Sequence, residues 1–190
     1  MKRSLLLTTA LAFLALGAAG WIAQSYTFES SSKIWVEGTS TVHDWTCTVT
    51  QFAGTVNAEP AEASFADLST TTLTVPVQGI DCDNGTMNGK VRDALGSSPI
   101  RYALTSATPG ASAADGWFSI RTTGNLSIAG ATQPAQMTVK AKALDGGRFR
   151  ITGQHALKMT DYGVSPPTAM FGTLKTGDEV TVHFDATISR

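Results

Sequence analysis

The sequence predicts an all-β protein, a sandwich or barrel of about eight antiparallel strands with one short helix. From Tyr26 onward, apolar and polar residues alternate with a period of two, which is typical of strands that bury one face. Turn signals rich in Gly, Asp and Pro separate these runs. Charged residues make up 15% of the chain, below the usual value of about 25%. We therefore expect outer strand faces that carry mainly Thr and Ser.

The predicted strands follow one another along the chain, each identified by the residues that share its apolar face. Pro76 places its strand at an edge or beside a bulge, because proline cannot donate a ladder hydrogen bond. The segment Asp145-Gly146-Gly147 lies between two strands and predicts a hairpin. In chain order, the apolar-face residues are His43, Trp45, Cys47 and Val49; Leu73, Val75 and Val77; Ile100, Tyr102 and Leu104; Met137 and Val139; Phe149 and Ile151; and Val180, Val182, Phe184, Ala186 and Ile188.

One segment breaks the alternation and predicts the helix. Met87, Val91 and Leu95 recur at helical spacing. Residues 84–88 offer N-caps, and Gly96 would end the helix. We therefore expect one short helix between two strands.

The chain is expected to form one domain over residues 24–190. Its 190 residues allow one sizeable core and hardly two. Closing the sheet into a barrel is the simplest way to protect so many Thr-rich strands from edge pairing. A barrel of about eight strands is also about the smallest that can enclose a ligand.

The first 23 residues differ in kind from the rest. Met1-Lys2-Arg3 is positively charged, and residues 4–23 are apolar apart from Ser4, Thr8 and Thr9. This pattern predicts a signal peptide over residues 1–23, and hence a periplasmic or secreted protein. The apolar stretch is also just long enough to span a bilayer, so an uncleaved N-terminal anchor is the competing interpretation.

The charge balance gives no sign of nucleic-acid binding. The formal net charge is −1, and without Lys2 and Arg3 the chain has 12 basic and 15 acidic residues. No basic patch is visible in the sequence, so the electrostatic attraction that nucleic-acid binding requires is absent.

The two cysteines, Cys47 and Cys82, favour a disulfide. An even number of cysteines in an exported chain indicates pairing. The chain-entropy model gives about 3.8 kcal/mol of stabilisation for a bond that closes this loop. Two free buried thiols are the alternative that the sequence leaves open.

The stretch from His43 to Cys47 contains the residue types of cysteine hydrolases and metal sites. If it is a strand, however, His43 and Asp44 point to opposite faces. His43 and Cys47 then lie about 13 Å apart, whereas a reactive pair needs about 3 Å. His43, His155 and His183 show no metal-ligand spacing. We therefore predict no enzyme, no metal and no cofactor, although an enzyme that uses His43, Cys47 or His155 remains the less favoured alternative.

The apolar-face residues of the successive strands could all project into one interior. Periodicity alone favours an ordinary packed core, and it does not distinguish a filled barrel from a hollow one. The candidate lining residues are Trp45, Phe65, Ile100, Tyr102, Leu104, Phe118, Ile120, Met137, Val139, Phe149 and Ile151.

The order of several motifs resembles the YceI-like family of periplasmic or secreted polyisoprenoid-binding proteins. The motifs are Gly38-Thr39-Ser40-Thr41-Val42-His43-Asp44-Trp45, Phe52-Ala53-Gly54, the helix region from Met87 to Ile100, the segment from Gly124 to Pro134, and Asp161-Tyr162-Gly163-Val164 followed by residues 166–172. The resemblance runs from Tyr26 to Arg190. Each motif is weak alone, and together in this order they are fairly specific.

The resemblance implies a lipocalin-like, eight-stranded antiparallel barrel that holds a long isoprenoid chain in a hollow interior. The expected function is the binding, transport or sequestration of a polyprenyl or quinone lipid outside the cytoplasm, without catalysis. The candidate lining residues would then contact the lipid. A homodimer and a transient contact with a membrane are both compatible with this role. The alternative is a filled barrel that acts as an interaction or stress module without lipid.

Overall fold

The computed structural model describes residues 24–61, 64–169 and 172–190, and the side chains of residues 59–67 and 169 fall outside this description. The predicted signal peptide, residues 1–23, also lies outside the described residues. The strands are β1 (Gln24–Phe28), β2 (Lys33–Ser40), β3 (Trp45–Val49), β4 (Ala53–Ala61), β5 (Ser64–Val75), β6 (Ile80–Asp81), β7 (Ile100–Ser112), β8 (Trp117–Ile128), β9 (Ala131–Leu144), β10 (Arg148–Lys158), β11 (Thr168–Ala169) and β12 (Leu174–Ser189). The helix is α1 (Gly85–Leu95), and two 3-10 turns are η1 (Val77–Gly79) and η2 (Met159–Tyr162).

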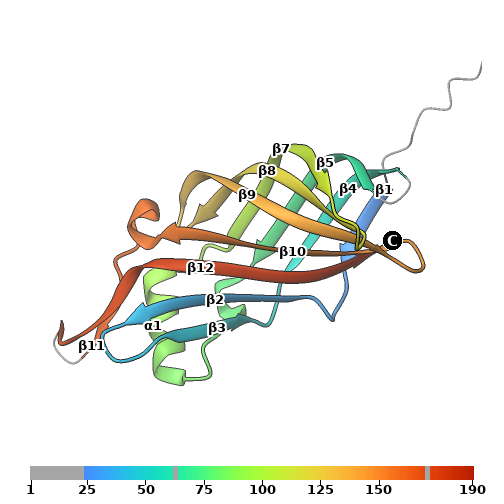
Figure 1. The fold of residues 1–190 in the computed structure, drawn as a ribbon. Coiled ribbons are helices and arrows are strands. Elements are labelled where there is room, and N and C mark those ends of the chain that lie inside the picture. Colours follow the sequence, from blue (N-terminus) through green and yellow to red (C-terminus); the bar gives the residue numbers. More distant parts are fainter. Residues whose placement is uncertain (1–23, 62–63, 170–171) are drawn as a thin grey trace, which may run out of the picture.

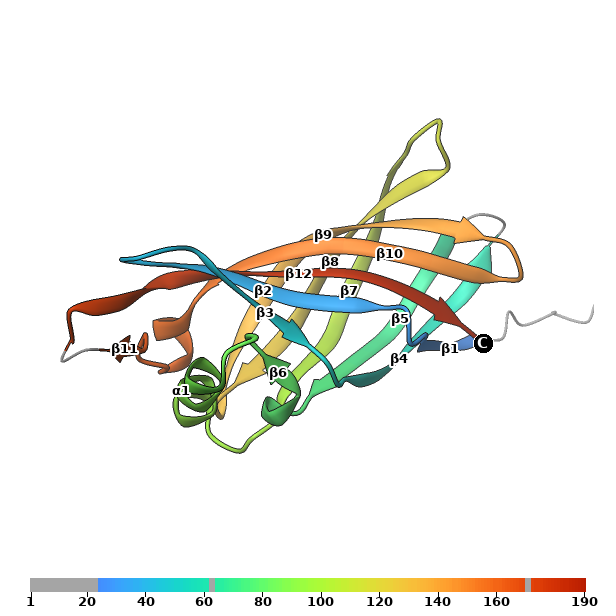
Figure 2. The ribbon, with the colours of Figure 1, turned by 90° about the horizontal axis from the view of Figure 1, so that it is seen from below.

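Eight of these strands form a closed antiparallel barrel, which confirms the predicted fold class. The strand order is β1-β4-β5-β7-β8-β9-β10-β12, and β12 closes the ring by pairing with β1 at Thr27↔Ser189 and Phe28↔Ile188. Further along, β12 also pairs with β2, which carries β3 and β6 as an additional flap. Figures 1 and 2 show the long strands wrapping around one interior.

The hairpin between β9 and β10 follows the predicted turn chemistry. Gly146 and Gly147 have φ angles of 76° and 70°, a backbone region that glycine adopts without steric cost. By contrast, Lys175-Thr176-Gly177-Asp178 is one of the Gly- and Asp-containing turn signals of the sequence, and the structure places it inside β12. The pairing of β12 with β2 shifts register between Thr176 and Val180, so these residues form an irregularity within the strand. Glycine fits there because a Cβ on Gly177 would lie 2.4 Å from Thr39 Oγ1 of β2.

Helix α1 lies where the sequence predicts it, across one end of the barrel (Figure 2). The Asn84 side chain caps it by accepting a hydrogen bond of 3.0 Å from the Met87 N–H, and Gly96 ends it at φ 70°. Met87, Val91 and Leu95 pack against the core cluster that contains Ile34, Cys47 and Ile80. The apolar face of the helix therefore covers this end of the barrel.

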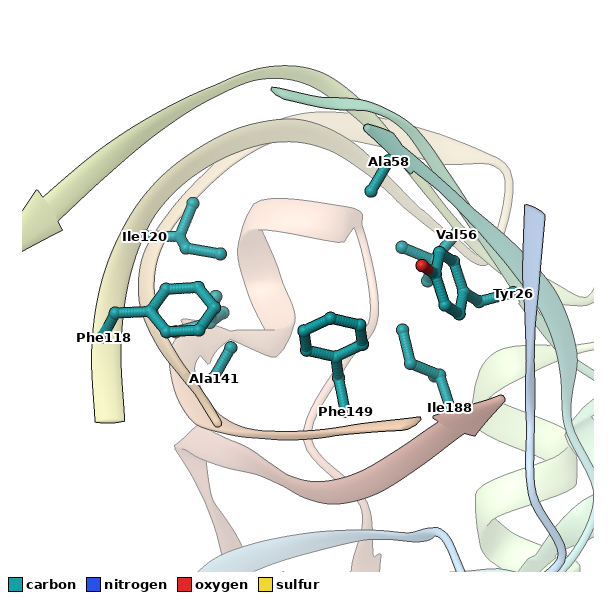
Figure 3. Packing of buried hydrophobic residues seen from close by; sticks show 9 residues of the cluster. Tyr26, Val56, Ala58, Phe118, Ile120, Ala141, Phe149 and Ile188 are labelled. Atoms are coloured by element: carbon teal, nitrogen blue, oxygen red, sulfur yellow. The ribbon is translucent and has the colours of Figure 1, made fainter. Parts of the chain in front are cut away.

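The opposite end of the barrel lies beside β1 and the C-terminus (Figure 1), and packed side chains close it (Figure 3). The Tyr26 and Phe149 rings meet edge to face, with centroids 5.7 Å apart. The cluster consists of Tyr26, Val56, Ala58, Phe118, Ile120, Val139, Ala141, Phe149 and Ile188. The barrel thus has one sealed end and one end covered by α1. None of the helices in the described part of the chain is long and apolar enough to cross a membrane.

Candidate functional site

An apolar cavity of about 210 Å³ occupies the interior of the barrel. Its walls come from the inward faces of strands on all sides, including Leu73 on β5, Leu126 on β8 and Phe184 on β12. The polar or titratable residues among its lining residues are Thr71, Tyr102, Thr122 and His155. The described barrel is therefore hollow, with an almost wholly hydrocarbon interior.

A second cavity of about 460 Å³ lies at the end covered by α1, and we call it the mouth. It is lined by residues of α1, η2, β11, β12 and the loop between β2 and β3. The residues that line both cavities are Val36, Ile80, Ile100, Ile128 and Val182. The mouth and the inner cavity therefore adjoin, and together they lead from α1 to the sealed end.

The mouth differs from the interior because it carries polar and basic side chains. Lys90 of α1 donates a hydrogen bond of 2.8 Å to the Thr168 carbonyl oxygen of β11. Lys175 of β12 and His43 of the β2–β3 loop also line the mouth. A ligand that enters from this end would meet these groups before it reaches the hydrocarbon interior.

Two hydroxyls are buried in the cavity wall without a hydrogen-bond partner in the described structure, Tyr102 OH and Thr71 Oγ1. The Tyr102 ring lies over Gly124, where a Cβ would be 2.5 Å from the ring. Burial raises the pKa of the Tyr102 phenol, and the nearby Thr122 hydroxyl opposes part of this rise. The geometry of the two hydroxyls does not meet the criteria for a hydrogen bond between them. Thr122 itself donates to the Met137 carbonyl at 3.1 Å.

Replacing Thr71 by valine is expected to raise the free energy of unfolding by about 1 kcal/mol. The methyl group keeps the shape of the side chain, and the change removes a buried hydroxyl whose lost hydration costs about 1–3 kcal/mol. Urea unfolding of the wild type and Thr71→Val measures the effect, with Thr70→Val, at an exposed position of the same strand, as the matched control. A marked loss of stability in Thr71→Val alone would show that the hydroxyl has a partner.

His155 faces the inner cavity from β10, because it alternates in step with Phe149 and Ile151 and therefore shares their face of the strand. Burial lowers the pKa of its imidazole, and a hydrogen bond with the Gln136 backbone opposes part of this shift. The ring is therefore held mainly in its neutral form near neutral pH. In this state it adds little polarity to the cavity.

The free energy of unfolding is expected to fall as the pH drops from about 7 to about 5, in part because of His155. The unfolded chain takes up a proton at a pKa of about 6.5, whereas the folded chain takes it up only at lower pH. Between these two values the unfolded state binds more protons, so stability rises with pH. Urea unfolding across this range should give a flatter profile for His155→Gln.

The carboxyl groups whose pKa is lowered in the folded protein affect its stability only at pH values below this range. Hydrogen bonds from Asn88, Thr160 and Arg150 respectively are the main causes that lower the pKa of Asp81, Asp178 and Asp185. Their usual value is already about 3.9, so their stabilising effect is lost at more acidic pH. An unchanged profile in His155→Gln between about pH 5 and pH 7 would therefore contradict the assignment to His155.

The stretch from His43 to Cys47 forms no reactive group in the described structure. β3 begins at Trp45, so the expectation that His43 lies on this strand was wrong. The Ser40 hydroxyl donates to the His43 carbonyl at 2.7 Å and organises a turn instead. Cys47 is bonded to Cys82, which is the disulfide that the sequence favours. No group of three metal-ligating side chains occurs among residues 24–61, 64–169 and 172–190.

A family model described as "YceI-like domain" matches residues 26–188. The chain belongs to the YceI-like family. A search of curated proteins finds no significant match.

Solved structures share the fold of this YceI-like barrel at low sequence identity. BcnA of Burkholderia cenocepacia is 18% identical with a TM-score of 0.67, over 83% of this chain and 96% of that chain. A polyisoprenoid-binding domain from Saccharophagus degradans is 13% identical with a TM-score of 0.65, over 86% and 97%. The YceI protein of Campylobacter jejuni is 12% identical with a TM-score of 0.58, over 76% and 84%.

The YceI-like barrel places the sequence-predicted lining residues in three groups. Ile100, Tyr102, Leu104, Ile120, Met137, Val139 and Ile151 line the inner cavity. Trp45 lines the mouth. Phe118 and Phe149 pack in the sealed end without lining either cavity, although Ile120 and Val139 belong to that cluster as well. Phe65 lies outside the described side chains.

Sequence reasoning missed other wall residues, and some of them had a visible signal. Val182, Phe184 and Ala186 alternate along the last strand, yet they were not among the candidate lining residues. Lys90 and Lys175 were missed as well, and no local pattern marks them, because the mouth assembles from elements far apart in the chain.

Proposed function

We propose that this YceI-like protein binds one long isoprenoid-type lipid, a polyprenyl or quinone compound, in the barrel interior. The observation that carries the proposal is the apolar cavity that adjoins the mouth at one end and meets packed aromatic residues at the other. A long, thin hydrocarbon tail matches this shape. The tail would lie in the inner cavity, with its headgroup at the mouth.

The energetics of burial support a hydrocarbon tail as the occupant. Each buried CH₂ group contributes about 0.8 kcal/mol, so a five-carbon isoprene unit contributes up to about 4 kcal/mol. Three or four units would outweigh association costs of about 4–15 kcal/mol. A strand of about ten residues spans about 33 Å, and β9 has 14 residues, so the barrel is long enough to enclose several units.

The protein would carry or sequester the lipid without catalysing a reaction on it, outside the cytoplasm. Cys47 has no free thiol, and the titratable residues lining the inner cavity are His155 and Tyr102. The signal-peptide pattern of residues 1–23 and the disulfide both support an oxidising compartment. Membership of the family and the name of the S. degradans domain support an isoprenoid in preference to other lipids.

Native mass spectrometry of the exported protein tests the proposal. We expect a bound mass that solvent extraction releases and that fragments as an isoprenoid lipid. The extracted protein should then take up a quinone or a prenyl alcohol at one-to-one stoichiometry. Repeated recovery of empty protein with no affinity for either compound would contradict lipid binding and favour the interaction module.

A further inference from the structure

Two lysines from distant parts of the chain are both neighbours of Thr168 at the mouth. Lys90 of α1 reaches the Thr168 carbonyl with its ammonium group, at 2.8 Å. Lys175 of β12 is the antiparallel partner of Thr168 across the β11–β12 pairing. Both lysines line the mouth cavity. The fold therefore brings two positive charges to the entrance of the apolar interior.

The loop between β2 and β3 brings His43 to the same place. The Thr41 N–H donates to the Lys175 carbonyl at 3.0 Å, and the Thr41 hydroxyl accepts from the Lys175 N–H at 3.2 Å. His43 follows two residues later and lines the mouth as well. These contacts hold the loop against β12, so His43 and Lys175 lie on neighbouring parts of the mouth.

The charges at the mouth are not balanced by carboxylates among its described lining residues. Lys90, Lys175 and His43 are the groups there that carry or can take up a positive charge. The remaining polar groups are uncharged, and they include the hydroxyls of Ser40, Thr86 and Tyr162 and the amide of Asn84. The one described side-chain hydrogen bond of Lys90 goes to a carbonyl oxygen, which carries no formal charge.

The mouth also adjoins the hydrocarbon interior directly. Ile80, Ile100 and Ile128 line both cavities, just inside the lysines. The opposite end of the barrel is packed with aromatic side chains, so a chain-like ligand fits with its tail toward Phe149 and its headgroup toward α1. The headgroup would then lie in the cavity that Lys90 and Lys175 both line.

We propose that the mouth selects isoprenoid lipids with a phosphate or diphosphate headgroup, held by Lys90 and Lys175 with His43 beside them. The proposal rests on the lipid-binding function proposed above and adds the chemical class of the headgroup. Lysine is a common phosphate binder that acts as a point charge. A neutral quinone or alcohol headgroup would gain only ordinary hydrogen bonds from the same groups.

Binding of geranylgeranyl diphosphate and geranylgeraniol, measured by titration calorimetry, tests the proposal. The two ligands share one tail and differ in the headgroup. We expect the diphosphate to bind at least about tenfold more tightly at low salt, which corresponds to about 1.4 kcal/mol, because hydrogen bonds between charged groups are stronger than those between neutral groups. High salt should reduce this preference and leave alcohol binding unchanged.

The variant Lys90→Gln/Lys175→Gln should lose the preference for the diphosphate while its affinity for the alcohol stays the same. Lys140→Gln, on the exposed face of β9, is the matched control and should behave as the wild type. Equal binding of the two ligands by the wild type, or a preference that survives in the double variant, would overturn the headgroup assignment alone. Failure of both ligands to bind the wild type would overturn the lipid-binding function as well.

Discussion

Replacing both Cys47 and Cys82 by alanine is expected to lower the free energy of unfolding by at least about 4 kcal/mol. The bond closes a loop with a sequence separation of 35, and the chain-entropy model gives about 3.8 kcal/mol for that length. A typical domain has only about 5–15 kcal/mol of stability. Urea unfolding of the oxidised wild type and the double variant gives the difference directly.

The same bond has a second consequence, because it ties β3 to the segment that leads into α1. Cys82 lies between β6 and α1, and the Cys82 N–H also donates to the Asn88 side chain at 2.7 Å. Without the bond, α1 is kept over the mouth by the short pairing of β6 with β3 and by the packing of its own side chains. We therefore expect α1 amides to exchange with solvent faster in the double variant.

The reduced wild type separates the bond from the side-chain change. Reduction leaves both sulfur atoms in the core, whereas alanine also removes buried volume, which costs stability by itself. We expect the reduced wild type to lose most of the stability that the double variant loses. A loss below about 1 kcal/mol in both proteins would show that the disulfide does not hold the fold together.

The fold class could be predicted because most strands carry a clear alternation of apolar and polar residues. In β12, the residues Val182, Phe184 and Ala186 face the cavity, while Asp185 binds Arg150 on the outer face at 2.8 Å. A period-two pattern fixes which residues share a face of the sheet. The helix was equally clear, since Asn84 and Gly96 supply both caps.

Strand ends were harder to predict, because they depend on contacts between strands. Gly177 looks like a turn residue in the sequence, yet it lies in β12 where Thr39 of β2 comes close. Similarly, His43 continues the alternation of the next strand, but a turn organised by Ser40 ends the pattern before Trp45. Local pattern alone does not contain these long-range contacts.

The alternation pattern did not show which inward residues line the cavity and which pack in the sealed end. Tyr102 and Phe149 both occupy inward positions, but Tyr102 lines the cavity and Phe149 packs against Tyr26 in the sealed end. The difference is their height along the barrel, which depends on the registers of all neighbouring strands. The mouth raises the same difficulty, because Lys90 and Lys175 become neighbours through their separate contacts with Thr168, which the sequence pattern does not show.

Replacing Leu104 by tryptophan is expected to weaken lipid binding by at least about a hundredfold. Leu104 lines the inner cavity from β7, further along the strand than Ile100, which lines both the inner cavity and the mouth. The indole ring would occupy space that the tail needs, and displacing three to four buried CH₂ groups already costs about 2.7 kcal/mol, which is a factor of about a hundred. Calorimetry with geranylgeraniol measures the loss.

Ala103→Trp provides the matched control, because Ala103 is the neighbouring residue on β7 and its side chain is exposed on the outer face. The two variants introduce the same indole on opposite faces of one strand. Because the cavity of about 210 Å³ offers room for the larger ring, Leu104→Trp should stay folded, and cooperative urea unfolding checks this. If folded Leu104→Trp binds the lipid as Ala103→Trp does, the tail does not occupy the barrel interior.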